Sequence, residues 1–330
     1  MQPPQTGFGG PPARLAACRY NGGMEIATSE PQGKRAAYLG GLAIAIGGAV
    51  LFSTKAIVAK LLYRYHLDAV TVIAFRMLFS LPVFAAIALW KMRTDPPLSR
   101  ADAWRLIGLG LVGYYLSSYL DFLGLQYITV GLERLILFLT PTFVLLGSAL
   151  WLKKHIGRSQ WLSLLTAYAG IVLVFFHDLR DGGSNVALGS LLVLGSALAY
   201  ALYLLGSGEM VKRLGSLRLV SYAMCVSSAA CIGQFFLLRP AGLLVQPMQV
   251  YGLSLVNGIL CTVMPVFMTM VAVQRIGAGP ASLAGMIGPV STLFFGAVIL
   301  SEPVTSWQLA GTALVLAGIY LLSKVKGKEK

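Results

Sequence analysis

Five ionisable side chains lie inside long apolar runs of this chain: Lys55, Arg76, Asp121, Glu133 and Arg134. A charge at the centre of a bilayer costs about 2.5–3.5 kcal/mol on insertion scales, so membrane proteins keep such residues where water, a partner charge or a ligand compensates them. Three cations and two carboxylates could bind a carboxylate, pair across helices, or take up and release a proton. These residues are therefore the first candidates for chemistry.

The composition points to a membrane as the main solvent. Hydrophobic residues make up 57% of the 330 residues and charged residues only 12%, against about 25% charged in soluble domains. This excludes a cytosolic enzyme, a secreted disulfide scaffold and a disordered chain. Four cysteines and three histidines show no metal-ligand spacing, and no catalytic set is present. We expect no enzyme activity, no metal and no cofactor.

Ten apolar runs, each near the ~20 residues that span a bilayer, position these charges. The predicted spans are 38–60, 67–90, 103–125, 129–152, 158–176, 186–208, 217–238, 249–273, 279–300 and 307–323. Alternating apolar and polar residues, the pattern of a β-barrel, do not occur, so the predicted fold class is an all-α membrane protein. We expect residues 1–37 to form a disordered cytoplasmic tail, in which Met24 is an alternative start, and residues 324–330 a basic cytoplasmic tail.

Basic residues set the orientation. Segments on the side of both termini hold 19 Lys and Arg residues, whereas the opposite loops hold 4. Cytoplasmic loops carry this excess, so both termini are predicted to be cytoplasmic. The same distribution explains the net charge of +14 without nucleic-acid binding.

The chain repeats itself at a constant offset of 148 residues. The offset superposes Gly41 on Gly189, Gly110 on Gly258, Gln126 on Gln274, Gly131 on Gly279 and Pro141 on Pro289. The repeats are 38–177 and 186–323, with five predicted helices each. Because five is odd, the second copy enters the membrane inverted. Inverted repeats are typical of secondary transporters, which bind substrate near the midplane between the halves and work by alternating access.

Two segments carry a family resemblance: GLERLILFLTPTFVLLGSALWL at 131–152 and GPASLAGMIGPVSTLFFGAVILSEPVT at 279–305. With these, the chain resembles a ten-helix, EamA-like member of the drug/metabolite transporter superfamily. The second segment ends in Ser301-Glu302 as the family does, whereas the first has Lys153-Lys154 there. The resemblance implies an exporter of small metabolites in a bacterial inner membrane. It also implies a cavity lined by helices 1–4 and 6–9, with helices 5 and 10 outside.

Candidate binding residues combine the deep charges with polar and aromatic stripes at helical spacing. The substrate-binding candidates are Lys55, Arg76, Tyr114, Asp121, Tyr200, Tyr203 and Asn257. Arg76 lies about 13 Å from its helix start at 1.5 Å per residue, and it is the candidate clamp for a substrate carboxylate. The alternative for the cations is that they snorkel to the outer surface.

Gating and coupling are assigned to Asp121, Glu133 and Arg134, which lie near the predicted outer end of their helices. We expect their carboxylates to pair with Lys55, Arg76 or Arg134 when the outer side closes and to bind protons when it opens. Pro141 and Pro289 are candidate hinges, or alternatively packing kinks.

The sequence thus predicts a secondary exporter of small amino-acid-like or amphipathic metabolites. The alternative is a lipid-carrier flippase or an accessory subunit of an envelope-modifying system. The expected partners are a small-molecule substrate, the lipid bilayer and protons. The sequence leaves monomer and homodimer open.

Overall fold

A computed structural model describes residues 32–152, 158–181, 185–276, 280–281, 284–285 and 287–328. Every regular element in these ranges is a helix, as predicted. Seven described helical segments are long and apolar enough to cross a membrane, and the apolar stretches Leu165–Leu179 and Ile287–Leu300 are shorter. Residues 1–31 of the predicted 1–37 tail and the Lys153-Lys154 pair lie outside the described residues.

The first repeat runs from α1 to α7. Its elements are α1 (Gln32–Tyr63), α2 (Ala69–Thr94), α3 (Arg100–Gly110), the π-helix η1 (Leu111–Leu116), α4 (Ser117–Leu125), α5 (Val130–Leu137), α6 (Thr140–Leu152) and α7 (Arg158–Asp181).

The second repeat begins at α8. Its elements are α8 (Val186–Leu214), α9 (Ser216–Leu238), the 3-10 helix η2 (Ala241–Leu244), α10 (Met248–Leu255), the π-helix η3 (Val256–Val263), α11 (Met264–Ile276), α13 (Ile287–Phe295), the π-helix η4 (Gly296–Leu300) and α14 (Ser306–Lys328).

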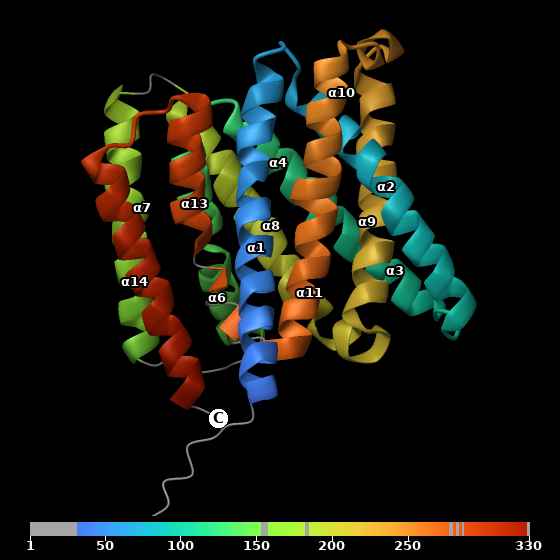
Figure 1. The fold of residues 1–330 in the computed structure, drawn as a ribbon, viewed down its shortest axis with the longest axis horizontal. Helices are drawn as coiled ribbons and strands as arrows, with labels where there is room; N and C mark the ends of the chain where they lie inside the picture. The colour runs from blue at the N-terminus through green and yellow to red at the C-terminus, as the bar shows by residue number, and fades with distance from the viewer. Residues whose placement is uncertain are drawn as a thin grey trace, which may run out of the picture.

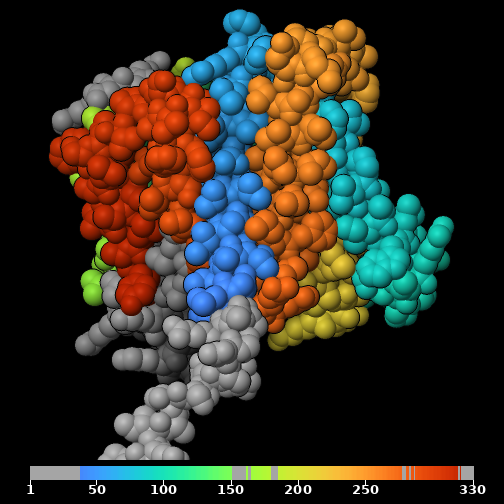
Figure 2. All heavy atoms as spheres, in the orientation of Figure 1, coloured from blue at the N-terminus to red at the C-terminus, as the bar shows by residue number. Residues whose placement is uncertain are grey.

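The two repeats pack as the halves of a two-fold arrangement. Helix α1 packs against α11, and its counterpart α8 packs against α4; α2 pairs with α9, and α7 pairs with α14. Figure 1 shows the start of α1 and the end of α14 on one side of the bundle, which we call the terminal side, opposite the distal side. In the space-filling view of Figure 2, α1 runs between the α13–α14 and the α10–α11 segments, as its contacts require.

Individual contacts obey the same symmetry. Gly41 lies against Ile276, and Gly189 lies against Ile128. The 148-residue offset relates Gly41 to Gly189 and Ile128 to Ile276. The two contacts are therefore counterparts of each other in the two repeats. Small residues let membrane helices approach closely, which explains why glycine occurs at both positions.

Two expected helix boundaries are wrong. The predicted span 129–152 is broken at Phe138–Leu139, and Pro141 lies in the first turn of α6 rather than in mid-helix. Likewise, α13 begins at Ile287 with Pro289 in its first turn. Proline fits there because the first-turn N–H groups have no intrahelical partner.

The ends of the chain differ from the expectation as well. Helix α1 begins at Gln32 instead of residue 38, and α14 continues to Lys328 instead of residue 323. Hydropathy marks only the apolar part of a membrane helix, so polar turns that continue it are missed by that criterion.

Candidate functional site

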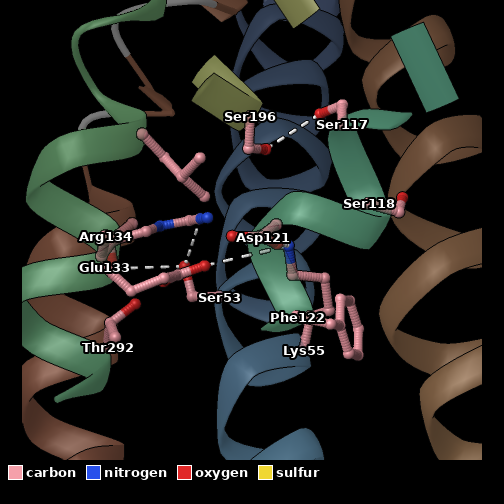
Figure 3. Close-up of polar contacts among 12 residues, drawn as sticks. Ser53, Lys55, Ser117, Ser118, Asp121, Phe122, Glu133, Arg134, Ser196 and Thr292 are labelled. Atoms are coloured by element: carbon pink, nitrogen blue, oxygen red, sulfur yellow. Dashed lines mark hydrogen bonds and ion pairs between the residues drawn. The ribbon is translucent and has the colours of Figure 1, made fainter. Parts of the chain in front are cut away.

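A buried ion pair joins three elements of the first repeat. The Nζ atom of Lys55 in α1 lies 2.5 Å from Oδ2 of Asp121 in α4 and 3.9 Å from Oε1 of Glu133 in α5. All three residues are at most 5% exposed. Figure 3 shows the three side chains pointing toward one another. The Lys55 ammonium is therefore shared between two carboxylates, and this triad ties α1 to α4 and α5.

Arg134 lies beside this triad and reaches the second repeat. Its guanidinium donates to Oγ of Ser53 at 2.9 Å, and the Ser53 hydroxyl is 3.1 Å from the carbonyl oxygen of Gly288 at the start of α13. The guanidinium also lies 5.0 Å from the ring centroid of Phe52. The contact from Arg134 through Ser53 to Gly288 thus crosses from one repeat to the other.

Arg76 lies on the other side of Asp121. It donates to Oγ of Ser118 in α4 at 2.8 Å, and its guanidinium stacks 4.8 Å from the Phe122 ring centroid. The Lys55 ammonium lies 5.5 Å from the same ring. We call Lys55, Arg76, Asp121, Glu133 and Arg134 the charge cluster. It holds three cations and two carboxylates, and no member snorkels, because each is at most 6% exposed.

Several polar atoms in and near the charge cluster are buried without a hydrogen-bond partner in the structure. These atoms are Nε of Arg76 and of Arg134, Oδ1 of Asp121, both carboxylate oxygens of Glu133, and both side-chain amide atoms of Asn257. Burying an unbonded polar group costs about 1–3 kcal/mol, more for a charged group. A ligand with both donors and acceptors would satisfy these atoms.

Three predicted tyrosines form a second cluster across the repeat interface. The hydroxyl groups of Tyr114 in η1 and Tyr203 in α8 lie 3.3 Å apart. Tyr200 completes the group, with ring centroids 6.3 Å from Tyr114 and 5.7 Å from Tyr203. One turn along, Ser117 and Ser196 share a 3.0 Å hydrogen bond, which is drawn in Figure 3. We call Tyr114, Tyr200 and Tyr203 the tyrosine cluster.

Asn257 belongs to neither cluster and is fully buried in η3. Its neighbour Gly258 packs so close to α2 that an added Cβ atom would lie 2.9 Å from the Arg76 carbonyl oxygen. The Asn257 amide is thus buried where the second repeat meets the helix that carries Arg76.

Ion pairs also bridge the repeats near both sides of the bundle. Near the distal side, Arg239 lies 2.9 Å from Oδ2 of Asp68. Near the terminal side, Arg213 lies 2.8 Å from Oδ2 of Asp102 and Arg218 donates to the Pro96 carbonyl oxygen at 2.7 Å.

The pKa of Asp68 reflects its bonds. Burial alone would raise it, but hydrogen bonds from Thr71 and Arg239 outweigh burial and lower the pKa.

Sequence reasoning missed four partners of the charge cluster: Phe52, Ser53, Phe122 and Gly288. They carry no charge and occur in apolar runs, where such residues are common. Spacing offered a weak signal only for Ser53 and Phe122, which lie within two residues of Lys55 and Asp121. Among the residues with described positions, no group of three His, Cys, Asp or Glu residues could hold a metal ion.

Comparison with known proteins gives one consistent family. The EamA-like transporter family matches residues 39–176 and again residues 187–324. The uncharacterised transporter YcbK of Bacillus subtilis is 29% identical over 316 residues, which cover 92% of this chain and 99% of that protein. An uncharacterised transporter of Archaeoglobus fulgidus is 26% identical over 78% of this chain and 89% of its own length.

A solved crystal structure shares the fold. It has a TM-score of 0.62 at 16% sequence identity and covers 88% of this chain and 99% of its own. At that identity the likeness extends to the fold alone.

Proposed function

Because the chain belongs to the EamA-like transporter family, we propose that it exports small amino-acid-like or amphipathic metabolites by alternating access. Membership of this family makes it a multi-pass membrane transporter, with a small molecule as its substrate. The direction, the substrate class and the bacterial inner membrane with cytoplasmic termini belong to the proposal. In this topology the terminal side is cytoplasmic and the distal side faces outward.

The observation that carries the substrate class is the charge cluster itself. It is buried, it has one more cation than carboxylates, and it keeps Arg76 Nε and Arg134 Nε unbonded. A substrate carboxylate would supply the missing negative charge and accept from Arg76. A substrate ammonium would donate to the unbonded oxygens of Asp121 or Glu133. The tyrosine cluster offers an aromatic and polar wall to the rest of the solute.

The ion pairs suggest how the distal side closes. Lys55 holds α1 against α4 and α5, and Arg134 meets the second repeat through Ser53. In our proposal these contacts form when the distal side is closed and separate when it opens. The breaks before α6 and α13 place Pro141 and Pro289 where half-helices can turn, which supports their assignment as hinges.

Proton coupling is the second part of the proposal. Asp121 and Glu133 share one ammonium, and neither Glu133 oxygen has a hydrogen-bond donor. If opening separates Lys55 from the carboxylates, a proton from outside can take its place. Each cycle would then exchange a proton for a solute.

The direct test is metabolomics of spent medium from cells with and without overexpression of the protein. We expect at least one zwitterionic or carboxylate-bearing metabolite to accumulate only with the protein. Unchanged medium together with movement of a fluorescent lipid between bilayer leaflets would refute export and favour the flippase alternative.

Two further assays test the remaining parts. A C-terminal reporter should read cytoplasmic, and a periplasmic reading would overturn the topology. In proteoliposomes, an imposed pH gradient should change solute flux, and unchanged flux would exclude proton coupling.

A further inference from the structure

An open, charged pocket, separate from the charge cluster, lies near the distal side. It has a volume of about 280 Å³ and is lined by Lys60, Tyr63, Arg64, Gln126, Leu300 and Glu302. Lys60 and Tyr63 lie at the end of α1 and Arg64 follows it; Gln126 follows α4, Leu300 ends η4, and Glu302 lies just after η4. We call it the distal pocket. Both repeats contribute to its wall.

The distal pocket keeps charges of both signs available. The Lys60 ammonium has no ion-pair partner within 4.0 Å among the described residues. Arg64 uses one nitrogen to donate to the Leu300 carbonyl oxygen at 3.0 Å. Glu302 accepts one bond, 3.1 Å from the Val130 N–H, through Oε2. Lys60, the other donors of Arg64 and the Glu302 carboxylate can therefore still bind a ligand.

Tyr63 and Phe122 connect the distal pocket to the charge cluster. The Tyr63 hydroxyl donates to the Phe122 carbonyl oxygen at 2.6 Å. The ring of Phe122 in turn lies 4.8 Å from the Arg76 guanidinium and 5.5 Å from the Lys55 ammonium. Phe122 thus contacts both a lining residue of the distal pocket and two members of the charge cluster, so the two sites are one residue apart.

We propose that the distal pocket is a second binding site for the transported solute and that it selects an amino-acid-like zwitterion. Lys60 and Arg64 bind the carboxylate, and Glu302 binds the ammonium. Tyr63 and Leu300 contact the apolar part of the solute. The volume lies near the lower end of the range for small-molecule pockets, about 300–1,000 Å³, which suits one small metabolite. This inference rests on the proposed function, because it gives the exported solute a site after it leaves the charge cluster.

The test uses three probes that share a phenyl ring and a short chain but differ in charge. L-Phenylalanine carries both groups, 3-phenylpropionate lacks the ammonium, and 2-phenylethylamine lacks the carboxylate. Gln126 lines the pocket and is exposed, so a Gln126→Cys variant can be labelled with a membrane-impermeant thiol reagent. The parent chain corrects for the four native cysteines. Protection from labelling reports that the distal pocket is occupied or closed, and its dependence on Glu302 and Lys60 identifies occupancy.

We expect L-phenylalanine to protect Cys at this position at concentrations about tenfold or more below those of the other two probes, since each charge-assisted contact contributes on that scale. Glu302→Gln should reduce L-phenylalanine to the level of 3-phenylpropionate, and it keeps an oxygen to accept from Val130. Lys60→Gln should weaken both carboxylate probes and spare the amine. Equal protection by all three probes, or an unchanged order in Glu302→Gln, would overturn the proposal.

A further variant separates this proposal from the proposed function. Arg76→Ala, made in the Gln126→Cys chain, should stop export and still show protection by L-phenylalanine. Export without any protection would reject the distal pocket and leave the transporter proposal standing. Protection without export by the otherwise unaltered chain would reject the exporter proposal instead.

Discussion

The two repeats share a scaffold and differ in chemistry. Helix α1 packs on α11 as α8 packs on α4, and matching glycines occur at the contacts. The charge cluster, however, belongs wholly to the first repeat. Its counterparts in the second repeat are uncharged: Tyr203, Met224, Thr269, Ala281 and Ser282. The counterpart of Lys55 is thus Tyr203, a member of the tyrosine cluster.

This difference shows which properties the symmetry requires. Close packing between halves needs small residues at fixed positions, so these recur at the offset. Charges in the pathway are under no such requirement, and an inverted copy places counterpart positions toward opposite sides of the membrane. We infer that the divergence gives the two sides of the pathway unlike affinities for the solute, with charges toward the distal side and tyrosines toward the terminal side.

The largest expected difference concerns the shared ammonium. Lys55→Met leaves Asp121 and Glu133 buried without their cation, and breaking a buried pair in this way costs about 3–5 kcal/mol. The counterpart Tyr203→Phe removes one neutral hydrogen bond and should cost about 1 kcal/mol. Unfolding by SDS titration measures both. Equal losses in the two variants would contradict the asymmetry.

Larger side chains at matching glycines should instead destabilise the two halves by equal amounts. A Cβ atom added at Gly110 would lie 2.9 Å from the Ala223 carbonyl oxygen, and one added at Gly258 would lie 2.9 Å from the Arg76 carbonyl oxygen. Gly110→Val and Gly258→Val should each destabilise by about 1–3 kcal/mol, as overpacking does. The same SDS titration tests this, and a loss in only one half would show that the scaffold symmetry is weaker than the contacts indicate.

Proton coupling gives a smaller, kinetic effect. Glu133→Gln keeps the shape of the site but removes one carboxylate from Lys55. We expect proteoliposomes with this variant to exchange solute across the membrane while their flux no longer responds to a pH gradient. The control variant Ala281→Ser, at the uncharged counterpart position, should leave the response of solute flux to a pH gradient intact. A normal gradient response in Glu133→Gln would assign that carboxylate to a structural role.

The smallest effect is expected at the distal ion pair of Asp68 and Arg239. Because the pKa of Asp68 is lowered in the folded state, the pair stabilises the fold above the unfolded pKa, and this contribution is lost as pH falls through the folded value. Both side chains are about a third exposed, so the gain is less than about 1 kcal/mol. Arg239→Gln should therefore lower stability slightly at pH 7, and this loss should shrink as the pH falls below the ordinary pKa of an aspartate. A loss that does not change with pH would point to packing instead.

The architecture could be predicted from the sequence, because hydropathy, the odd number of helices in each repeat and the constant 148-residue offset can all be read along the chain. The sequence also located the charge cluster, since ionisable residues are rare in apolar runs. The sequence could not predict that two carboxylates share Lys55, because this depends on how α1, α4 and α5 are rotated relative to one another. It also missed the breaks before α6 and α13, because a proline in an apolar run fits a kink as well as a helix start.

Glu302 illustrates the same limit. Its place after η4 is visible in the sequence as part of the family ending. Its bond to Val130 and its position in the distal pocket depend on how the two repeats meet. Contacts between residues 172 positions apart have no local signature.

The central claim is that charges of the first repeat bind the solute, and Arg76 with its counterpart Met224 tests it most directly. Spent-medium metabolomics should compare cells expressing wild type, Arg76→Ala and Met224→Ala, with the amount of folded protein in the membrane measured for each. Our account predicts that carboxylate-bearing metabolites accumulate with wild type and Met224→Ala, and fall at least about 30-fold with Arg76→Ala, the equivalent of about 2 kcal/mol. Equal accumulation with Arg76→Ala and wild type, at equal protein levels, would contradict it.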